Sequence, residues 1–404
     1  MKTTKQENKA SPPLNLAASV ALSPRQIALR KLYRFVTIVG VIIAVCGLAV
    51  TLTLYGDRIF KKSRQNRTVF GRDLPIREPK LNPTDAPAGA APEGMVWIRG
   101  GEFYMGTDVA DEEDVPMFLD ATDLHLVHVD GFWMDKHEVT NEQFAKFIEE
   151  TKYLTEAEKQ PNPKDFPDVP PSELKPFSII FKKPEPGTYD LSRHEGWWDI
   201  SYGASWKQPN GPGSTIKGIE RYPAVHISYN DAVAYCKWAK KRLPTEAEWE
   251  FAGRGGLDRK KFSWGDEINP DGRWMANTWQ GNFPLENKKL DGFEGAAPVK
   301  SFPANDYGLY DMAGNVWEWC ADWYVQDYYS KCYDKDLTKA FRNPQGPDAG
   351  FDLREAQAAK RVQRGGSFMC SPNYCERYYI GARGKGEVTS AASHTGFRCA
   401  MNAK

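Results

Sequence analysis

Along most of the chain, the apolar residues come in short runs rather than in long periodic stretches. Runs at Met95–Ile98 and Phe103–Met105 and the alternating stretch Leu124–Val129 predict short strands. The C-terminal third reads as loops and short strands rich in Gly and aromatic residues. Within it, the polar and irregular residues 324–360 are expected to form a surface insertion. These patterns predict an α+β domain with little regular secondary structure.

Three helices are expected from their start signals. The first follows Thr140, whose capping partner Gln143 lies three residues on. Apolar residues then recur at the spacing of one helical face. The second helix follows Ser228. The third follows Thr245, whose capping partner is Glu248.

One longer apolar run precedes the domain. No charged residue occurs from Phe35 to Gly56. At about 1.5 Å per residue, a helix of this length spans about 33 Å, enough for the hydrocarbon core of a bilayer. We therefore expect an N-terminal tail at residues 1–34 and a single-pass transmembrane anchor at residues 35–56. Basic residues flank the run almost equally, so the charge count does not set its orientation.

A proline-rich segment follows the predicted anchor. Residues 57–93 lack apolar periodicity, and five prolines interrupt their second half. Such composition is typical of an extended tether. The folded domain is therefore expected at residues 94–404.

The composition narrows the class of protein. The chain has 404 residues, with 53 Lys and Arg against 53 Asp and Glu. A formal net charge of zero gives no reason to expect a nucleic-acid partner. The 34 glycines and 28 prolines favour loops, and the 13 tryptophans can supply core volume between short elements.

Seven cysteines bring in candidate chemistry, and two of them, Cys370 and Cys375, lie close together in the sequence. Ser371-Pro372-Asn373 between them is a turn signal, so the chain is expected to fold back and let the thiols converge. The pair has three interpretations: a structural disulfide, a redox-active dithiol, or a soft-metal site, because thiolates favour Cu(I) and zinc. On spacing alone the disulfide has the most weight, and all three remain open.

The segment that contains this pair, RVQRGGSFMCSPNYCER at 361–377, closely resembles formylglycine-generating enzymes, the sulfatase-modifying-factor family. Other segments that resemble the family are MVWIRGGEFYMGTD at 95–108, MDKHEVTNEQF at 134–144, YLTEAEK at 153–159, NDAVAYCKWAKKRLPTEAEWEFAGRGG at 230–256, ANTWQGNFP at 276–284, YGLYDMAGNVWEW at 307–319 and the ending SHTGFRCA. The resemblance covers about residues 95–404. It implies a single loop-rich sulfatase-modifying-factor domain of C-type lectin-like type.

The resemblance implies an oxidoreductase that converts a cysteine of a client protein to formylglycine. In the family, two cysteines bind Cu(I), the substrate thiol joins the copper, and O2 is activated there with a thiol as reductant. Cys370 and Cys375 are then the expected copper ligands, and Ser367 and Trp317 are expected to line the active site. Taken alone, Trp317 is equally a core aromatic residue and Ser367 a turn hydroxyl. The expected client is an unfolded or nascent sulfatase-type polypeptide with a Cys-x-Pro-x-Arg motif.

Two structural Ca2+ sites are also implied by the resemblance. The expected ligands of the first are Asn277, Thr278, Asp291 and Phe293. Those of the second are Asp311, Gly314, Val316 and Glu318, and Glu138 is a further expected calcium ligand. Carboxylate, amide and carbonyl oxygens from loops suit Ca2+. Without the resemblance, the same acids read as solvated or capping residues.

The remaining cysteines bear on the compartment. The resemblance implies a disulfide between Cys236 and Cys399, which requires an oxidising environment. We therefore expect a membrane-anchored, single-pass monomer with its catalytic domain outside the cytoplasm, in a periplasm or a secretory lumen. Cys320 is expected to be a buried thiol. The sequence departs from the animal members at Gly253 and Ile380, where those enzymes have two cysteines joined to each other.

Two rival functions remain open. A non-catalytic member of the same family would act as a binding or scaffold protein. Such members lack one or both cysteines of the pair, so Cys370 and Cys375 argue against this function. A lectin-like surface module would fit the calcium matches and would leave the cysteine pair without a role.

Overall fold

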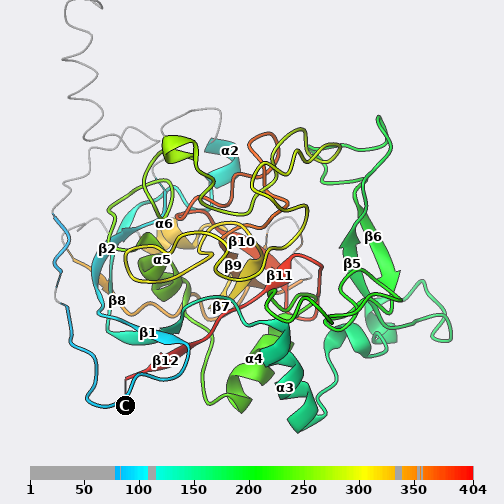
Figure 1. Cartoon of the computed structure of the whole chain (residues 1–404), viewed down its shortest axis with the longest axis horizontal. Helices are drawn as coiled ribbons and strands as arrows, with labels where there is room; N and C mark the ends of the chain where they lie inside the picture. Colours follow the sequence, from blue (N-terminus) through cyan, green and yellow to red (C-terminus); the bar gives the residue numbers. More distant parts are fainter. Residues whose placement is uncertain are drawn as a thin grey trace, which may run out of the picture. The chain divides into compact units, whose positions relative to one another are not determined.

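The computed structural model describes residues 78–81, 83–107, 115–332, 339–352, 355 and 358–403. The chain divides into two units, residues 1–65 and 66–404, and all described residues belong to the second. In this unit, short strands and helices are joined by long loops (Figure 1). The prediction of a loop-rich single domain with mixed sheets is confirmed.

The strands within the described residues are β1 (Met95–Ile98), β2 (Gly101–Met105), β3 (His125–Val129), β4 (Phe132–Asp135), β5 (Phe177–Phe181), β6 (Trp198–Tyr202), β7 (Trp317–Trp323), β8 (Phe341–Arg342), β9 (Lys360–Arg364), β10 (Gly384–Glu387), β11 (Thr395–Gly396) and β12 (Ala400–Asn402). The α-helices are α2 (Val115–Phe118), α3 (Asn141–Thr151), α4 (Tyr229–Trp238), α5 (Glu246–Arg254) and α6 (Tyr328–Cys332). Three short 3₁₀ helices, Glu156–Glu158, Pro163–Asp165 and Pro270–Gly272, lie in the loops.

The strands form small sheets that join distant parts of the chain. Their orders are β1-β4-β12, β10-β9-β7-β11, β2-β3-β8 and β5-β6. Neighbours run antiparallel except in the pairs β7–β11 and β3–β8, which are parallel. The sheet β10-β9-β7-β11 lies at the centre of Figure 1, and the β5–β6 pair lies apart from it. The C-terminal strand β12 pairs with β4, so the end of the domain closes onto its beginning.

The three predicted helices are confirmed together with their caps. Thr140 and Gln143 form the capping box of α3, and Thr245 and Glu248 form that of α5. Ser228 caps α4 by accepting the backbone N–H of Asp231, whose carboxylate in turn accepts the N–H of Ser228. Each box satisfies backbone donors that a helix start leaves unpaired. These local bonds explain why the start signals were reliable.

Helix α5 is the central element of the core. It contacts β2, β3, β7 and β9. Nearly all its side chains are buried, Trp249 and Phe251 among them. A second apolar cluster joins α3, α4 and the C-terminal segment through stacked and edge-on contacts of Phe144, Tyr235 and Phe397.

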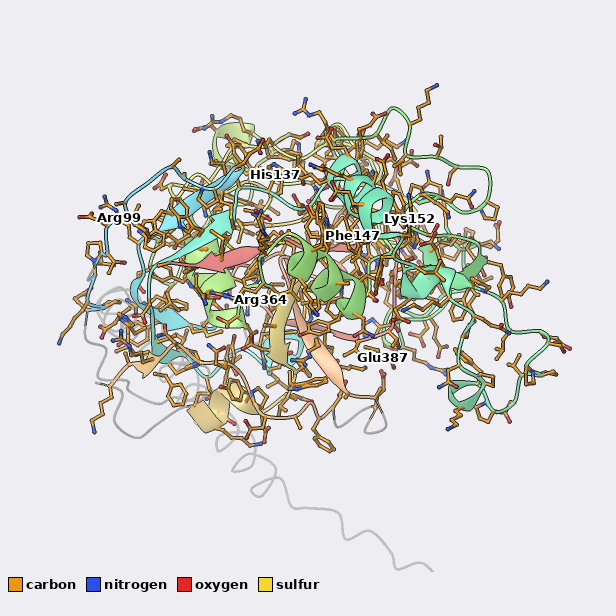
Figure 2. The ribbon with its side chains drawn as sticks, turned by 90° about the horizontal axis from the view of Figure 1, so that it is seen from below. Arg99, His137, Phe147, Lys152, Arg364 and Glu387 are labelled. Atoms are coloured by element: carbon orange, nitrogen blue, oxygen red, sulfur yellow. The ribbon has the colours of Figure 1, made fainter. Side chains whose placement is uncertain are left out.

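A buried ion network fastens α5 to β9. Arg364 at the end of β9 donates to Glu246 Oε1 at 2.8 Å and to Glu250 Oε2 at 2.6 Å. It also donates to the carbonyl of Ile380 at 2.7 Å. Arg383 shares Glu246 from the other side. All four charged side chains are at most 1% exposed, and Arg364 lies well inside the fold whereas Arg99 lies at its edge (Figure 2).

Most described residues of 324–360, predicted as a surface insertion, are exposed or half-buried, but several of their side chains enter the core. Tyr324 and Tyr329 are 2% and 1% exposed, and Asp352 is fully buried beside Lys360. β8 extends the sheet of β2 and β3. The two tyrosines enter the core because their hydroxyls find partners there, Asp120 for Tyr324 and Arg364 for Tyr329. The polar composition of this segment gave no sign of Asp120 and Arg364, the partners of the two tyrosines.

The last described part of the predicted tether lies along the domain. Thr84 N donates to the carbonyl of Arg99 at 2.9 Å, and Trp97 Nε1 donates to the carbonyl of Thr84 at 2.8 Å. The backbone N–H of Lys80 donates to Glu102 Oε2 at 2.7 Å. Residues just before β1 are therefore hydrogen-bonded to the first strands.

The prediction of a membrane-anchored, single-pass protein is corrected by the structure. No helix among the residues described above is long and apolar enough to cross a bilayer. The longest of them, α3, has 11 residues. At about 1.5 Å per residue such a helix covers about half of the hydrocarbon core. Residues 35–56, where the anchor was predicted, lie outside the described part of the chain.

Replacing the central arginine should cost far more stability than replacing a surface one. We expect Arg364→Met to lower the free energy of unfolding by about 3–5 kcal/mol, because Glu246 and Glu250 lose a buried partner. The matched control is Arg342→Met, since Arg342 pairs with Asp130 at the surface and should contribute less than about 1 kcal/mol. Urea unfolding measures both. Equal losses of unfolding free energy in the two variants would contradict a central role of Arg364 in stability.

Candidate functional site

The two cysteines Cys370 and Cys375 lie at the ends of a tight turn, and their sulfurs are 2.8 Å apart. The turn closes through the carbonyl of Ser371, which accepts the N–H of Tyr374 at 3.1 Å and that of Cys375 at 2.9 Å. Both residues are thiols in this structure, Cys370 buried and Cys375 partly exposed. The turn signal and the convergence of the thiols are confirmed.

The backbone that leads into this turn is fixed at several points. Gly365 and Gly366 both have positive φ, and a Cβ on Gly366 would lie 2.8 Å from the backbone nitrogen of Tyr378. A side chain at position 366 would collide with the backbone of Tyr378, so glycine is required there. The N–H of Phe368 donates to the carbonyl of Asn315 at 2.9 Å, and the carbonyl of Cys370 accepts the N–H of Trp279 at 2.9 Å.

The environment separates the acidities of the two thiols. Burial, together with the hydrogen bond to Cys375, raises the pKa of Cys370 well above its usual value. The hydrogen bond from Cys370 lowers the pKa of Cys375 against the opposing effect of burial, and the charge of Arg377 adds to the lowering. Cys375 is thus the residue favoured as a thiolate, with Cys370 as its hydrogen-bond donor.

Ser367 and Trp317 both adjoin the cysteine turn. Ser367 is fully buried, its hydroxyl accepts the N–H of Met369 at 3.2 Å, and its carbonyl accepts the N–H of Cys370 at 2.9 Å. Trp317 on β7 packs in one apolar cluster with Cys370 and Tyr378. The structure brings all four predicted active-site residues together, and the roles of Ser367 and Trp317 in chemistry stay predictions.

Aromatic residues from distant loops support one side of the turn. The ring of Tyr374 stacks on Phe283 with centroids 4.3 Å apart and meets the edge of Trp197 at 5.1 Å. The Tyr374 hydroxyl lies 3.2 Å from His194 Nδ1. The sequence reasoning missed these contacts, since nothing local links Phe283 or Trp197 to the cysteines.

On the other side of the turn, α2 holds the residues that follow Cys375. The thioether of Met117 accepts the N–H of Glu376 at 3.3 Å, and its carbonyl accepts from Arg377 Nη2 at 2.7 Å. Arg377 also lies 3.4 Å from the carboxylate of Asp120. This support, too, was not predicted, because the short segment Val115–Phe118 shows no periodicity or motif.

The residues of the first predicted calcium site gather around Asp291. Its carboxylate accepts the N–H of Thr278 at 3.1 Å and that of Phe293 at 3.0 Å. The side-chain nitrogen of Gln280 donates both to Asp291 Oδ2 and to the carbonyl of Thr278. Two predicted ligand oxygens therefore converge on one NH2 group, whose positively polarised hydrogens lie where a cation could bind.

The second predicted calcium site brings acidic residues together below the surface. Burial, and then the charges of Asp311 and Glu318, raise the pKa of Glu138 well above its usual value. Burial, with the charge of Glu318 adding to it, raises the pKa of Asp311 to about 6. Glu138 Oε2 is buried without a hydrogen-bond partner. A cation would relieve this repulsion and satisfy the orphan oxygen.

The acidic side chains alone do not complete either site. Arg398 forms a bidentate pair with Glu318 at 2.6 and 2.7 Å. In the described portion of the chain, no three His, Cys, Asp or Glu side chains form a group that could hold a metal ion. Carbonyl oxygens, such as those predicted for Thr278, Phe293, Gly314 and Val316, would have to supply the remaining ligands.

Asn315 connects the candidate calcium sites to the cysteine turn. Its side chain donates to Glu138 Oε1 at 2.9 Å and accepts from Asn277 Nδ2 at 3.2 Å. Its carbonyl accepts the N–H of Phe368. Asn315 has a φ of 56°, a left-handed conformation that asparagine tolerates better than most residues. That preference, within the GNVWEW segment, is the signal that could have identified it.

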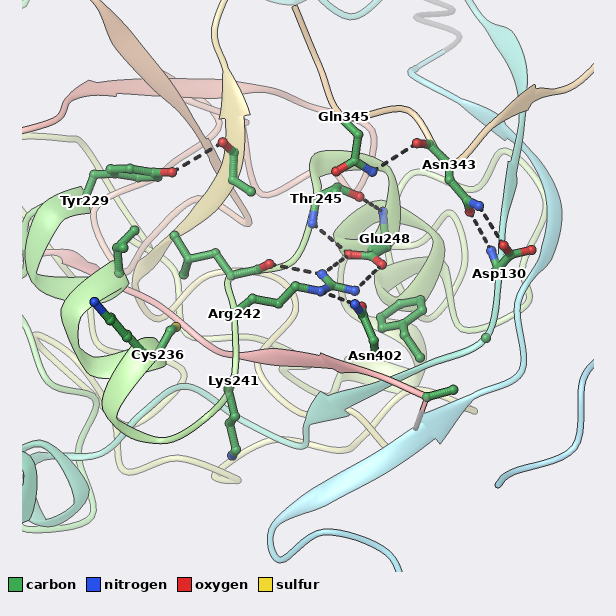
Figure 3. A pocket seen from close by; sticks show the side chains of 17 residues that line it. Asp130, Tyr229, Cys236, Lys241, Arg242, Thr245, Glu248, Asn343, Gln345 and Asn402 are labelled. Atoms are coloured by element: carbon green, nitrogen blue, oxygen red, sulfur yellow. Dashed lines mark hydrogen bonds and ion pairs between the residues drawn. The ribbon is translucent and has the colours of Figure 1, made fainter. Parts of the chain in front are cut away.

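The second cysteine pair lies away from the turn. The sulfurs of Cys236 and Cys399 are 3.3 Å apart, and both residues are thiols in this structure. Their disulfide stays a prediction, and the geometry brings the two partners together. Cys236 also lines a cavity of about 710 Å³ that contains the Arg242–Glu248 ion pair (Figure 3). Cys320 is fully buried, as predicted.

Gly253 and Ile380, the two departures from the animal members, meet in the core. A Cβ on Gly253 would lie 2.5 Å from Ile380 Cδ1. The isoleucine side chain therefore fills the space next to the glycine. The resemblance correctly implied that these two positions are neighbours.

Comparisons with known proteins agree with this geometry. Residues 81–403 match the model of the sulfatase-modifying factor enzyme 1-like domain. The formylglycine-generating enzyme of Thermomonospora curvata is 41% identical over 337 residues, 82% of this chain and 98% of that protein. That of Mus musculus is 42% identical over 327 residues, 79% of this chain and 78% of that protein. The inactive C-alpha-formylglycine-generating enzyme 2 of Bos taurus is 38% identical over 312 residues, 76% of this chain and 88% of that protein.

The asymmetry of the two thiols predicts their order of reaction. In the metal-free reduced protein, Cys375 should be alkylated faster than Cys370 near neutral pH, because its pKa is lowered and its side chain is partly exposed. Cys370→Ala should shift the pH profile of Cys375 alkylation upward, since the donor is lost, whereas Cys370→Ser keeps a donor. Mass spectrometry after timed alkylation measures the rates, with buried Cys320 as the unreactive reference. An unchanged profile in Cys370→Ala would rule out the donor role.

Proposed function

The chain belongs to the sulfatase-modifying-factor family, and we propose that it oxidises a cysteine of a sulfatase polypeptide to formylglycine at Cys370 and Cys375. The observation that carries this proposal is the pair of thiols held 2.8 Å apart in the turn that follows β9. Relatives named formylglycine-generating enzyme are 41–42% identical over most of the chain and support an enzymatic function. The relative named inactive, at 38% identity, shows that overall likeness alone does not decide activity.

We propose Cu(I) as the metal that Cys370 and Cys375 would hold. Two soft sulfur donors, one of them favoured as a thiolate, fit this ion. The apolar cluster of Trp317, Tyr378 and Ala382 would limit access of water to the pair. Bound copper would supply the one-electron chemistry that O2 requires and that thiols and zinc do not provide.

The protein's residues would prepare the thiols for this role. Cys370 has to give up the proton that it now donates to Cys375, since only a thiolate binds metal. Arg377 places a positive charge near Cys375 and is itself fixed by Asp120 and by the carbonyl of Met117. Arg377 would thus offset part of the negative charge that the pair acquires.

The proposed reaction needs an external reductant. One substrate cysteine, one O2 and two molecules of a small thiol would give one formylglycine aldehyde, one hydrogen sulfide, one disulfide of the small thiol and one water. In this balance the substrate carbon is oxidised, O2 is reduced, and the two thiols supply two electrons and two protons. The proposed client is an unfolded or nascent sulfatase segment with a Cys-x-Pro-x-Arg motif.

We also propose that calcium ions stabilise the loops beside the turn. The orphaned Glu138 Oε2 and the raised pKa of Asp311 support the second site, and the oxygens that converge on Gln280 support the first. Because Asn315 contacts both groups of ligands and the backbone before Cys370, calcium would stabilise the approach to the turn.

The rival function is a non-catalytic scaffold of the same family. One relative is named an inactive enzyme, so the family includes such proteins. The retained and converged pair Cys370–Cys375 favours catalysis over this rival. A lectin-like module would fit the proposed calcium ligands but would leave the converged cysteine pair without a role.

Conversion of a peptide tests the enzyme directly. Reduced protein loaded with Cu(I) should convert the cysteine of a Cys-x-Pro-x-Arg peptide to an aldehyde in the presence of O2 and a thiol, as measured by mass spectrometry. Cys375→Ala should lower kcat/KM by at least about 1,000-fold, equal to about 4 kcal/mol of transition-state stabilisation. Cys332→Ala, which removes a buried thiol outside the turn, is the matched control. Absence of conversion, or equal conversion by Cys375→Ala, would refute the proposal.

Calcium removal should destabilise the protein in a pH-dependent way. The ordinary pKa of Asp311 is 3.8, and it is raised to about 6 in the folded metal-free chain. Protonation of Asp311 therefore stabilises that form, and this contribution is lost as pH rises through about 6. Added Ca2+ should raise the melting temperature more at about pH 7 than at about pH 5. Asp311→Asn should weaken the response, whereas exposed Asp271→Asn should keep it. A melting temperature unaffected by a chelator would count against calcium.

A further inference from the structure

The hydroxyl group of Tyr378 is buried beside the cysteine turn without a hydrogen-bond partner. Tyr378 is 2% exposed and packs in one apolar cluster with Cys370 and Trp317. Within the described part of the chain, no other member of this cluster has a buried side-chain nitrogen or oxygen that lacks a partner. A buried hydroxyl without a partner is unfavourable, and folded proteins retain few of them. Its position beside the thiols indicates a partner that arrives after folding.

The ring of Tyr378 is fixed, so its hydroxyl does not reach solvent. Phe262 stacks on the ring with centroids 6.0 Å apart, and Tyr379 meets it edge-on at 5.6 Å. The backbone of Tyr378 lies directly against Gly366, since a Cβ at position 366 would lie 2.8 Å from the Tyr378 nitrogen. A partner therefore has to form next to the hydroxyl, within the cluster.

The thiols lie within electrostatic reach of this hydroxyl. Burial and then the charge of Glu376 are the largest causes that raise the pKa of Tyr378, and charges on Cys370 and Cys375 add to them. Tyr378 therefore keeps its proton at neutral pH and can donate a hydrogen bond. A negative sulfur that disfavours ionisation of the phenol also attracts its O–H dipole.

Cys370 needs such a donor when it binds metal. Its sulfur lies 2.8 Å from that of Cys375, and burial, followed by the hydrogen bond to Cys375, raises its pKa well above the usual value. Hydrogen bonds with Ser367 offset only part of this effect. Metal binding replaces the thiol proton and leaves a thiolate sulfur in an apolar cluster. A further hydrogen-bond donor would lower the energy of that sulfur.

We propose that Tyr378 is a positioning residue that donates a hydrogen bond to the sulfur of Cys370 when the cysteine pair holds copper. This inference rests on the proposed binding of Cu(I) and adds a residue to it. In the metal-free protein the hydroxyl is unsatisfied, which lowers stability. In the metal-bound protein the same hydroxyl has a charged acceptor, so the contact strengthens metal binding.

Two effects of opposite sign test this role. Tyr378→Phe should raise the melting temperature of the metal-free reduced protein, because it removes the unsatisfied hydroxyl and keeps the ring. The same variant should bind Cu(I) about tenfold more weakly, as measured by competition with a coloured Cu(I) chelator. The matched control is Tyr153→Phe, since the Tyr153 hydroxyl donates to Asp231 at 3.0 Å in the apolar cluster of α3 and α4. This control should lower the melting temperature and leave the affinity for Cu(I) unchanged.

A vibrational measurement follows the hydroxyl itself and does not depend on turnover. Infrared difference spectra of protein with isotope-labelled tyrosine should show a tyrosine carbon–oxygen band that shifts when Cu(I) is added, and Tyr378→Phe should lack this shift. Unchanged Cu(I) affinity or a lowered melting temperature in Tyr378→Phe would overturn the inference. Absence of the shift, or of Cu(I) binding, in the wild type would also overturn it. If the shift and the loss of affinity occur but no peptide is converted, the proposed oxidation fails and the role of Tyr378 in metal binding stands.

Discussion

The guanidinium group of Arg364 is the point on which the arrangement of the site depends. It lies without solvent contact between Glu246 and Glu250 of α5, and it also donates to the carbonyl of Ile380. A buried charge of this kind tolerates little displacement, because an unpaired ion in the interior is strongly unfavourable. The same residue directly precedes Gly365. Both ends of the segment 364–380, which contains the cysteine turn, are therefore held to one helix and to each other.

Within those fixed ends, the turn takes its properties from unequal surroundings. Toward Tyr374 it meets stacked aromatic rings, and toward Arg377 it meets a cation that donates to the carbonyl of Met117. The hydrogen bond from Cys370, to which the charge of Arg377 adds, lowers the pKa of Cys375, whereas burial raises the pKa of Cys370. The pair Cys236–Cys399 has no such asymmetry in exposure, since both sulfurs belong to residues at most 2% exposed. Two cysteine pairs with sulfurs 2.8 and 3.3 Å apart are thus expected to differ in reactivity, because their surroundings and exposure differ.

The sequence allowed prediction wherever one short segment contains the whole interaction. The caps of α3 and α5 and the turn at Ser371-Pro372-Asn373 are of this kind, and they were located correctly. Contacts between distant segments left no local trace. Met117 meets Glu376 across 259 positions, and Phe283 reaches Tyr374 from another loop. The burial of two tyrosines within 324–360 was missed for the same reason, since Tyr324 and Tyr329 enter the core through partners far away in the sequence.

The contact between Gly253 and Ile380 has a consequence for how the domain matures. The described residues contain six cysteines, which can be joined into three bridges in about 15 ways. Two further cysteines at these positions would raise the number to about 105. An apolar side chain rather than a thiol fills this part of the core, so the contact adds no cysteine that could pair wrongly if the chain were oxidised. With fewer thiols in the chain, Cys370 and Cys375 have fewer partners with which an oxidant could join them wrongly.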